Sequence, residues 1–168
     1  MKKGLVFFLF LFTVLIGQAQ VDTTTPPYKK FPTLPPVQIL LGDSTTKFTK
    51  ESIAKGKPVL FMVFSPDCSH CQHEAEELVA HRDEMKDIQI VMITLHPLWQ
   101  MNEFVKNYKL DQLKNVVVGK DVYYIMPSFY NIGNLPFLAM YNKNGGLISV
   151  FEGSLGISKV IDLFKQNQ

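Results

Sequence analysis

The feature that most constrains the fold is an apolar run, KPVLFMVFS at residues 57–65, that leads directly into a pair of cysteines. A nearly continuous run of β-forming residues predicts a strand buried on both faces, in the middle of a sheet. The stretch SPDCSHCQHEAEELVAHRDEM follows it at once. The helical spacing of Ala75 and Leu78, with glutamates early in the stretch, predicts a helix that begins near Asp67 or Cys68.

The rest of the chain alternates β-forming runs with amphipathic segments. Strands that alternate with helices imply an α/β sheet whose crossover connections lie on its faces. The further predicted elements are strands at 37–41, 88–95 and 115–119, a short strand within GDSTTKFT, a helix at 97–110, a β-hairpin at 135–153 that turns at Asn144-Gly145-Gly146, and a helix at 157–166.

The amino terminus predicts export. Lys2 and Lys3 precede an apolar run at 5–16, and small residues end the segment, which is typical of a secretory signal peptide at 1–19 cut after Ala19. An uncleaved anchor is the alternative, although the run is shorter than the about 20 residues that a spanning helix needs. We therefore expect a periplasmic or secreted bacterial protein with no stable membrane insertion after cleavage.

The remaining chain is long enough for one domain with its own hydrophobic core. Two of the 17 basic residues lie in the leader, which leaves 15 basic and 15 acidic side chains. Arg82 is the single arginine, so the chain lacks the basic footprint of a nucleic-acid-binding protein. Residues 20–36 carry five prolines and predict an extended tether or edge segment, followed by a single domain at 37–168.

The two cysteines predict redox chemistry. A bridge between Cys68 and Cys71 would close a very small loop, which stabilises a fold least. At the start of a helix the two side chains share one face, and the partial positive charge of the helix end favours a thiolate, the nucleophile of disulfide exchange. We expect the outer Cys68 to attack a partner disulfide and Cys71 to resolve it. A protonated His70 would support the Cys68 thiolate, whereas Asp67 would oppose it.

The order of buried strand, short loop, C-x-x-C and helix, together with Pro136 in GNLPFLAMY, resembles the thioredoxin superfamily. The likeness covers roughly residues 37–166 and is greatest to exported bacterial disulfide reductases of the cytochrome-maturation type. It implies a thioredoxin-like fold, with a central mixed β-sheet flanked by helices in a single domain. It also implies that Pro136 is a cis proline facing the cysteine pair, with Leu135 offering its backbone to a substrate peptide.

The implied activity is that of an exported protein thiol–disulfide oxidoreductase. It would reduce or exchange disulfides of periplasmic proteins with no cofactor beyond the redox-active disulfide Cys68–Cys71, and a membrane thiol transporter would supply electrons. The sequence departs from the family at four places: Asp67 replaces a common Trp, Ser-His replaces Gly-Pro between the cysteines, Met62 replaces a buried acid, and Leu135 replaces Thr, Val or Ile. These departures leave the direction of electron flow open.

Two other site types fit part of the sequence pattern. The pattern C-x-H-C-x-H at 68–73 suits copper(I) or zinc, with His96 as a further donor in a metal-carrier module. Four side chains on one helix do not converge easily on one ion, so we expect no metal. A peroxidase would use the hydroxyl of Ser65, but Phe61 stands where its loop needs proline, and Arg82 lies eleven residues beyond Cys71.

The remaining polar and aromatic residues have simpler interpretations. We expect Glu74, Glu76 and Glu77 on a solvated helix face near the positive helix end. Trp99 is expected in the core. His96 is expected to be an ordinary loop residue before a proline.

Overall fold

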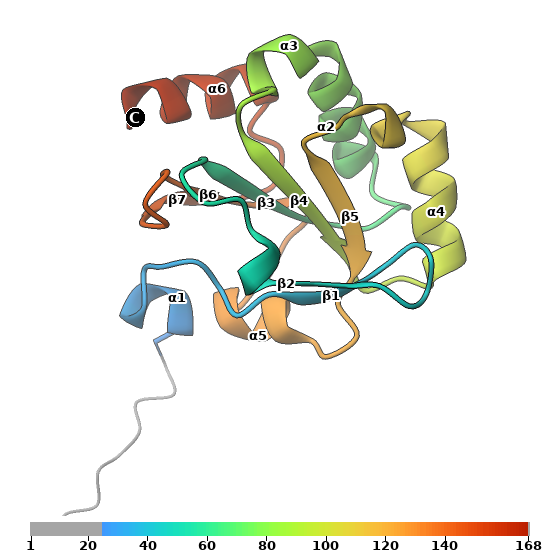
Figure 1. Ribbon diagram of the computed structural model, residues 1–168, viewed down its shortest axis with the longest axis horizontal. Helices are drawn as coiled ribbons and strands as arrows, with labels where there is room; N and C mark the ends of the chain where they lie inside the picture. The colour runs from blue at the N-terminus through green and yellow to red at the C-terminus, as the bar shows by residue number, and fades with distance from the viewer. Residues whose placement is uncertain (1–24, 168) are drawn as a thin grey trace, which may run out of the picture.

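The computed structural model describes residues 25–167, so the predicted signal peptide lies outside the described residues (Figure 1). No helix of the described part is long and apolar enough to cross a membrane. The strands are β1 (Gln38–Leu41), β2 (Lys47–Thr49), β3 (Val59–Phe64), β4 (Gln89–Thr94), β5 (Val116–Lys120), β6 (Phe137–Tyr141) and β7 (Leu147–Glu152). The α-helices are α1 (Pro27–Lys30), α2 (Ser69–Ala80), α3 (Arg82–Met85), α4 (Leu98–Asn107), α5 (Ile125–Tyr130) and α6 (Ile157–Gln166).

The seven strands form one mixed sheet in the order β2-β1-β5-β4-β3-β6-β7. β3, β4 and β5 are parallel, while β6 pairs antiparallel with β3, and β7 and β1 pair antiparallel at either side. The predicted central mixed sheet with flanking helices is confirmed. β3 lies inside the sheet with every residue buried, as its unbroken apolar sequence predicts.

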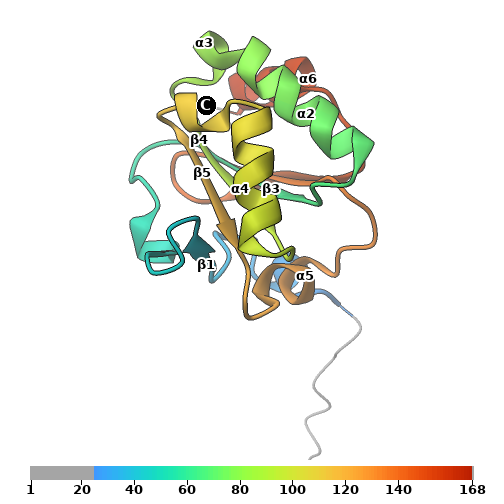
Figure 2. The same cartoon turned by 90° about the vertical axis from the view of Figure 1, so that its right-hand side faces the viewer.

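Helices cover both faces of the sheet (Figures 1 and 2). One hydrophobic cluster joins α2, α3, α4 and α6 to the sheet face of Leu60, Met62 and Phe64. The second cluster lies under α5 and the start of the described chain, on the face of Phe61 and Val63. Because successive strand residues point to opposite faces, β3 contributes alternately to the two clusters.

The predicted helix after β3 is interrupted. α2 ends at Ala80, and His81, with φ −98° and ψ 21°, separates it from the short α3. Two short helices, α1 and α5, were not predicted, because segments of four and six residues show too little periodicity to detect.

Residues 25–36 of the proline-rich segment pack against the domain. Tyr28 stacks against Tyr130 with ring centroids 5.5 Å apart, and Leu34 packs on the second cluster. The backbone of residues 32–34 bonds to the β6–β7 turn, through Leu147 N–H to Pro32 O at 2.9 Å and Leu34 N–H to Gly145 O at 3.2 Å. The described part therefore lies along the β6–β7 hairpin as an edge segment, one of the two alternatives that the sequence left open.

The expected solvated face of glutamates is also wrong in part. Glu76 is exposed, but Glu74 is fully buried. Oε1 of Glu74 accepts hydrogen bonds from Leu155 N–H and Gly156 N–H, both at 2.9 Å, and Oε2 of Glu77 accepts from Ile157 N–H at 2.8 Å. These carboxylates face the amino-terminal end of α6, where unpaired N–H groups and a partial positive charge favour them.

Candidate functional site: the thiol pair at the start of α2

The cysteine pair lies where β3 passes into α2, at the carboxyl end of the central parallel strands. Cys68 is the N-cap residue of α2, and its sulfur accepts a hydrogen bond from Cys71 N–H at 3.3 Å. Both are free thiols; Cys68 is half-buried and Cys71 is fully buried. The order of exposure matches the expectation from their positions in the helix.

The two thiols lie in different environments. Burial, and after it the hydrogen bond with the Cys68 side chain, raises the pKa of the Cys71 thiol to about 12. A hydrogen bond from the backbone of Ser65 acts in the opposite direction and lowers the pKa of Cys71. Cys71 is therefore a protonated, shielded thiol at neutral pH, and Cys68 is the thiol that a partner can reach.

A second loop completes the site. The Leu135–Pro136 peptide bond is cis, and Cys68 Sγ–H donates to the Leu135 carbonyl oxygen across 3.8 Å. Gly153 N–H in turn bonds Pro136 O at 2.8 Å, which ties this loop to the end of β7. An apolar cavity of about 240 Å³ lies beside it, lined by Leu135, His96 and aliphatic neighbours. The loop thus presents a peptide carbonyl to the outer sulfur.

A polar network not expected from the sequence reaches the same site. Ser65 Oγ lies 3.0 Å from His96 Nε2, and His96 Nδ1 lies 2.9 Å from Gln100 Oε1. His96 is therefore bound on both ring nitrogens and is not a simple loop residue. The contact joins the end of β3 to the end of β4 across 31 positions of sequence, so local pattern could not predict it. The one signal in the sequence was a hydroxyl residue, Ser65, three positions before Cys68.

Solved structures share this architecture. No protein-family model matches the sequence, and no curated protein matches it significantly. A secreted Mycobacterium tuberculosis disulfide oxidoreductase, described as homologous to E. coli DsbE, is 18% identical with a TM-score of 0.66, over 78% of this chain and 96% of that one. The exposed lipoprotein thioredoxin of Streptococcus pneumoniae is 19% identical with a TM-score of 0.61, over 77% and 98%.

The chain has a thioredoxin-like fold. The same fold also resembles a peroxidoxin of M. tuberculosis, at 12% identity and a TM-score of 0.68 over 81% of this chain and 96% of that one. At such identities the likeness establishes the fold alone, so the chemistry must come from the site.

The peroxidase pattern is not assembled in this thioredoxin-like chain. Arg82 is exposed at the start of α3, beyond the far end of α2 from Cys68. A helix rises 1.5 Å per residue, so α2 is about 18 Å long. Cys68 lies at one end of α2 and Arg82 lies beyond the other end. Phe61 is a buried core residue of β3 rather than part of the loop.

The sequence-predicted modulators and metal donors are dispersed. Asp67 and His70 are both exposed around the cysteines. His73 points to Glu77, with Nε2 3.7 Å from its Oε1, and His96 turns to Ser65. Within residues 25–167, no group of three or more His, Cys, Asp or Glu side chains is placed to hold a metal ion.

One exposed aromatic side chain lies near the thiol loop, and two others lie after β5. Trp99, expected in the core, is 64% exposed and borders a hollow of about 350 Å³ with Pro66 and Asp67. Tyr123 and Tyr124, just after β5, are also more than half exposed. His96 lies in the short loop between β4 and α4, and Trp99 lies in the first turn of α4. Trp99 is therefore beside the thiol site and not between α4 and the core.

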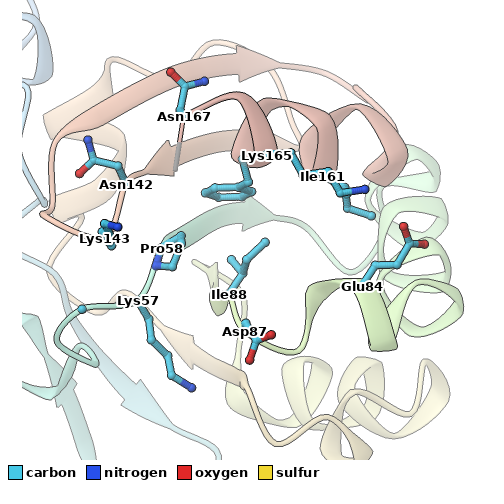
Figure 3. Close-up of a pocket in the computed structure, with 12 residues that line it drawn as sticks. Lys57, Pro58, Glu84, Asp87, Ile88, Asn142, Lys143, Ile161, Lys165 and Asn167 are labelled. Atoms are coloured by element: carbon cyan, nitrogen blue, oxygen red, sulfur yellow. The ribbon is translucent and has the colours of Figure 1, made fainter.

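A larger cavity lies at the other end of the sheet. It has a volume of about 420 Å³ and lies at the start of β3, between the chain that enters β3 and helices α3 and α6 (Figure 3). Pro58, Ile88 and Phe164 form its apolar wall, with charged residues such as Glu84 and Lys165 around it. It contains no cysteine or histidine, so it does not belong to the thiol site.

Proposed function

We propose that this protein is an exported thiol–disulfide oxidoreductase that reduces or exchanges disulfides of proteins in the bacterial periplasm. One observation carries the proposal: a reachable Cys68 caps α2, a shielded Cys71 lies one turn later, and the Leu135 carbonyl faces the outer sulfur. The named disulfide oxidoreductases and thioredoxins among the structural neighbours support it.

The reaction follows from the unequal thiols. The Cys68 thiolate attacks one sulfur of a substrate disulfide, forms a Cys68–substrate disulfide and releases the other substrate sulfur as a thiolate. Cys71 then loses its proton to solvent, and its sulfur attacks Cys68 Sγ. The Cys68–Cys71 bond forms as the Cys68–substrate bond breaks, and the second substrate thiolate leaves. Two electrons pass from the protein to the substrate, and the pair itself is the only redox group that the reaction requires.

The surrounding residues fit a peptide substrate. The Leu135 carbonyl and the apolar cavity beside it offer hydrogen bonding and apolar contact to a chain that lies against Cys68. The exposed Trp99 adds apolar surface next to the loop. In an oxidising compartment a reductase needs a source of electrons, and a membrane thiol donor that reduces the Cys68–Cys71 disulfide would meet that need.

The test is the reduction potential of the pair together with insulin reduction. Protein lacking residues 1–19 is equilibrated in glutathione buffers, and free thiols are counted by alkylation. A potential near about −270 mV indicates a reductase, and one near about −120 mV indicates an oxidant. Cys68→Ser should abolish insulin reduction, and Cys71→Ser should accumulate a mixed disulfide with the substrate.

Two results would contradict the proposal. The first is the absence of any reversible disulfide between the cysteines. The second is tightly bound, stoichiometric copper or zinc that protects both thiols from alkylation, which would favour a metal carrier.

A further inference from the structure

The carboxylate of Glu152, the last residue of β7, holds the loop that precedes the cis proline. Its Oε1 accepts a hydrogen bond from Gly133 N–H at 3.2 Å, and its Oε2 accepts one from Asn134 N–H at 3.1 Å. The Asn134 side chain adds a third, from Nδ2 to Oε2 at 3.2 Å. One carboxylate therefore bonds two successive backbone N–H groups, and hydrogen bonds to a charged acceptor are stronger than neutral ones.

The loop joins α5 to β6 and is anchored at both of its ends. At the α5 end, Ile132 N–H bonds Pro127 O at 3.4 Å. At the β6 end, Pro136 O accepts a hydrogen bond from Gly153 N–H at 2.8 Å. Between these two anchors the loop backbone is held by the carboxylate of Glu152.

The glycine at position 133 allows the carboxylate to come this close. A Cβ atom there would lie 3.2 Å from Glu152 Oε2, closer than most Cβ contacts in proteins. The φ angle of Gly133 is not positive, so the backbone conformation does not by itself require glycine. The missing side chain therefore fits the approach of the Glu152 carboxylate.

The loop that Glu152 holds forms two parts of the thiol site. Leu135 presents the carbonyl oxygen that Cys68 Sγ–H contacts across 3.8 Å. Gly133 and Leu135 also line the apolar cavity of about 240 Å³, together with His96. An apolar cavity of about 150 Å³ holds a benzene ring, so this one has room for an apolar side chain of a substrate. The position of the loop therefore decides how a bound peptide meets Cys68.

We propose that Glu152 is a positioning residue for peptide substrates, because its carboxylate holds the loop with the Leu135 carbonyl and the cavity wall in place beside Cys68. This inference rests on the proposed oxidoreductase function and deepens it. Without the carboxylate, binding of a peptide must also order the loop, which costs conformational entropy. A disulfide that carries no peptide chain makes no use of the loop and does not bear this cost.

The experiment compares two mixed disulfides of thionitrobenzoate. One carries a short peptide with a single cysteine flanked by leucines, and the other carries 2-mercaptoethanol. In each, the Cys68 thiolate of the reduced protein attacks the sulfur of the peptide or of mercaptoethanol, and thionitrobenzoate leaves as a thiolate. Because the leaving group is the same, the ratio of the two second-order rate constants, peptide over mercaptoethanol, reports the contacts made to the peptide.

Glu152→Ala should lower this ratio about tenfold, and it should leave the rate constant for the mercaptoethanol disulfide within about twofold of wild type. Glu152→Gln keeps the length of the side chain and one acceptor oxygen, so it should lower the ratio about threefold. Glu152→Gln also carries the test if Glu152→Ala folds poorly.

Glu51→Ala is the matched control. Glu51 is also an exposed glutamate whose carboxylate accepts a hydrogen bond, from Thr49 Oγ1 at 2.7 Å. It follows β2, at the opposite edge of the sheet from β7. Glu51→Ala should leave both rate constants, and so their ratio, unchanged.

The outcomes separate the inference from the function it rests on. An unchanged ratio in both Glu152 variants would overturn the inference and leave the oxidoreductase proposal standing. Equal slowing with both disulfides would also overturn it, since that indicates a general disturbance of the site. Release of thionitrobenzoate that does not require Cys68, or no reaction of the unaltered protein with either disulfide, would instead remove the proposed function.

Discussion

At the scale of residues, the two thiols should differ sharply toward alkylating agents. Because burial raises the pKa of Cys71 to about 12, its thiol is almost entirely protonated at pH 7. Iodoacetamide at pH 7 should therefore label Cys68 in the reduced native protein and spare Cys71. Labelling of Cys71 should increase as the pH rises toward 12, measured by mass mapping of peptides.

The control for this prediction is the same labelling in guanidinium chloride. Both cysteines should then react at similar rates, since unfolding removes the burial. Equal labelling of the two cysteines in native protein at pH 7 would contradict the assignment of Cys71 as the shielded thiol.

Sequence position predicts the exposure of a single residue well where its neighbours in space are also its neighbours in sequence. The exposure of Cys68 and the burial of Cys71 follow from their places on the first turn of one helix. His96 could not be assigned in this way, because its partner Ser65 comes from another strand. The predicted burial of Trp99 is wrong for a related reason. The apolar character of a residue alone does not say whether it lies on the side of α4 that faces the core.

At the scale of elements, α6 depends on α2 for its amino-terminal cap. Its own N-cap residue is Gly156, which has no side chain to bond the first N–H groups, and no acid lies in its first turn. Glu77 of α2 supplies an acceptor for the first N–H group of α6, that of Ile157, and Glu74 accepts from Leu155 and Gly156 just before the helix. The connection holds together two helices on the same face of the sheet.

Glu74→Ala should therefore lower the free energy of unfolding by about 1.5–3 kcal/mol, the range for hydrogen bonds to a charged group. The matched control is Glu76→Ala, an exposed glutamate two residues away, which should change it by less than about 0.5 kcal/mol. Urea denaturation followed by circular dichroism measures both. Similar values for the two variants would show that the α2–α6 contact contributes little.

Elements with a strong repeat were predictable, and short or interrupted ones were not. α6 shows a clear amphipathic repeat and was predicted at its observed bounds. The sequence does not show the break at His81. The residues around it keep helical spacing, while the backbone leaves the helical conformation at this one residue. The burial of Glu74 likewise depends on a loop 80 residues further along the chain.

At the scale of the whole molecule, alternation of strands and helices indicates an α/β sheet but does not give the order of its strands. Neither the antiparallel pairing of β1 with β5 nor the packing of residues 25–36 follows from local pattern. Tyr130 and Tyr141 illustrate this limit. Their hydroxyl oxygens lie 2.6 Å apart in the interior of the second cluster, where α5 meets β6.

The buried phenol groups of Tyr130 and Tyr141 predict that the folded protein loses stability in alkali. Burial raises the pKa of Tyr141 from 10 to about 12, and burial raises that of Tyr130 well above its usual value. Cys71 of the reduced protein behaves in the same way. The folded state therefore binds more protons than the unfolded state above about pH 9, so the free energy of unfolding must fall as the pH rises from there through 12.

Urea denaturation of reduced protein between pH 7 and pH 11 measures this fall. The Tyr130→Phe/Tyr141→Phe double variant removes both phenolic protons without leaving either hydroxyl unpaired, so its stability should decline less over the same range. A stability that is level from pH 8 to pH 11, or an equal decline in the double variant, would contradict the prediction. Both tyrosines lie in the cluster under α5. The contribution of Cys71 to the decline can be separated from theirs by oxidising the cysteine pair.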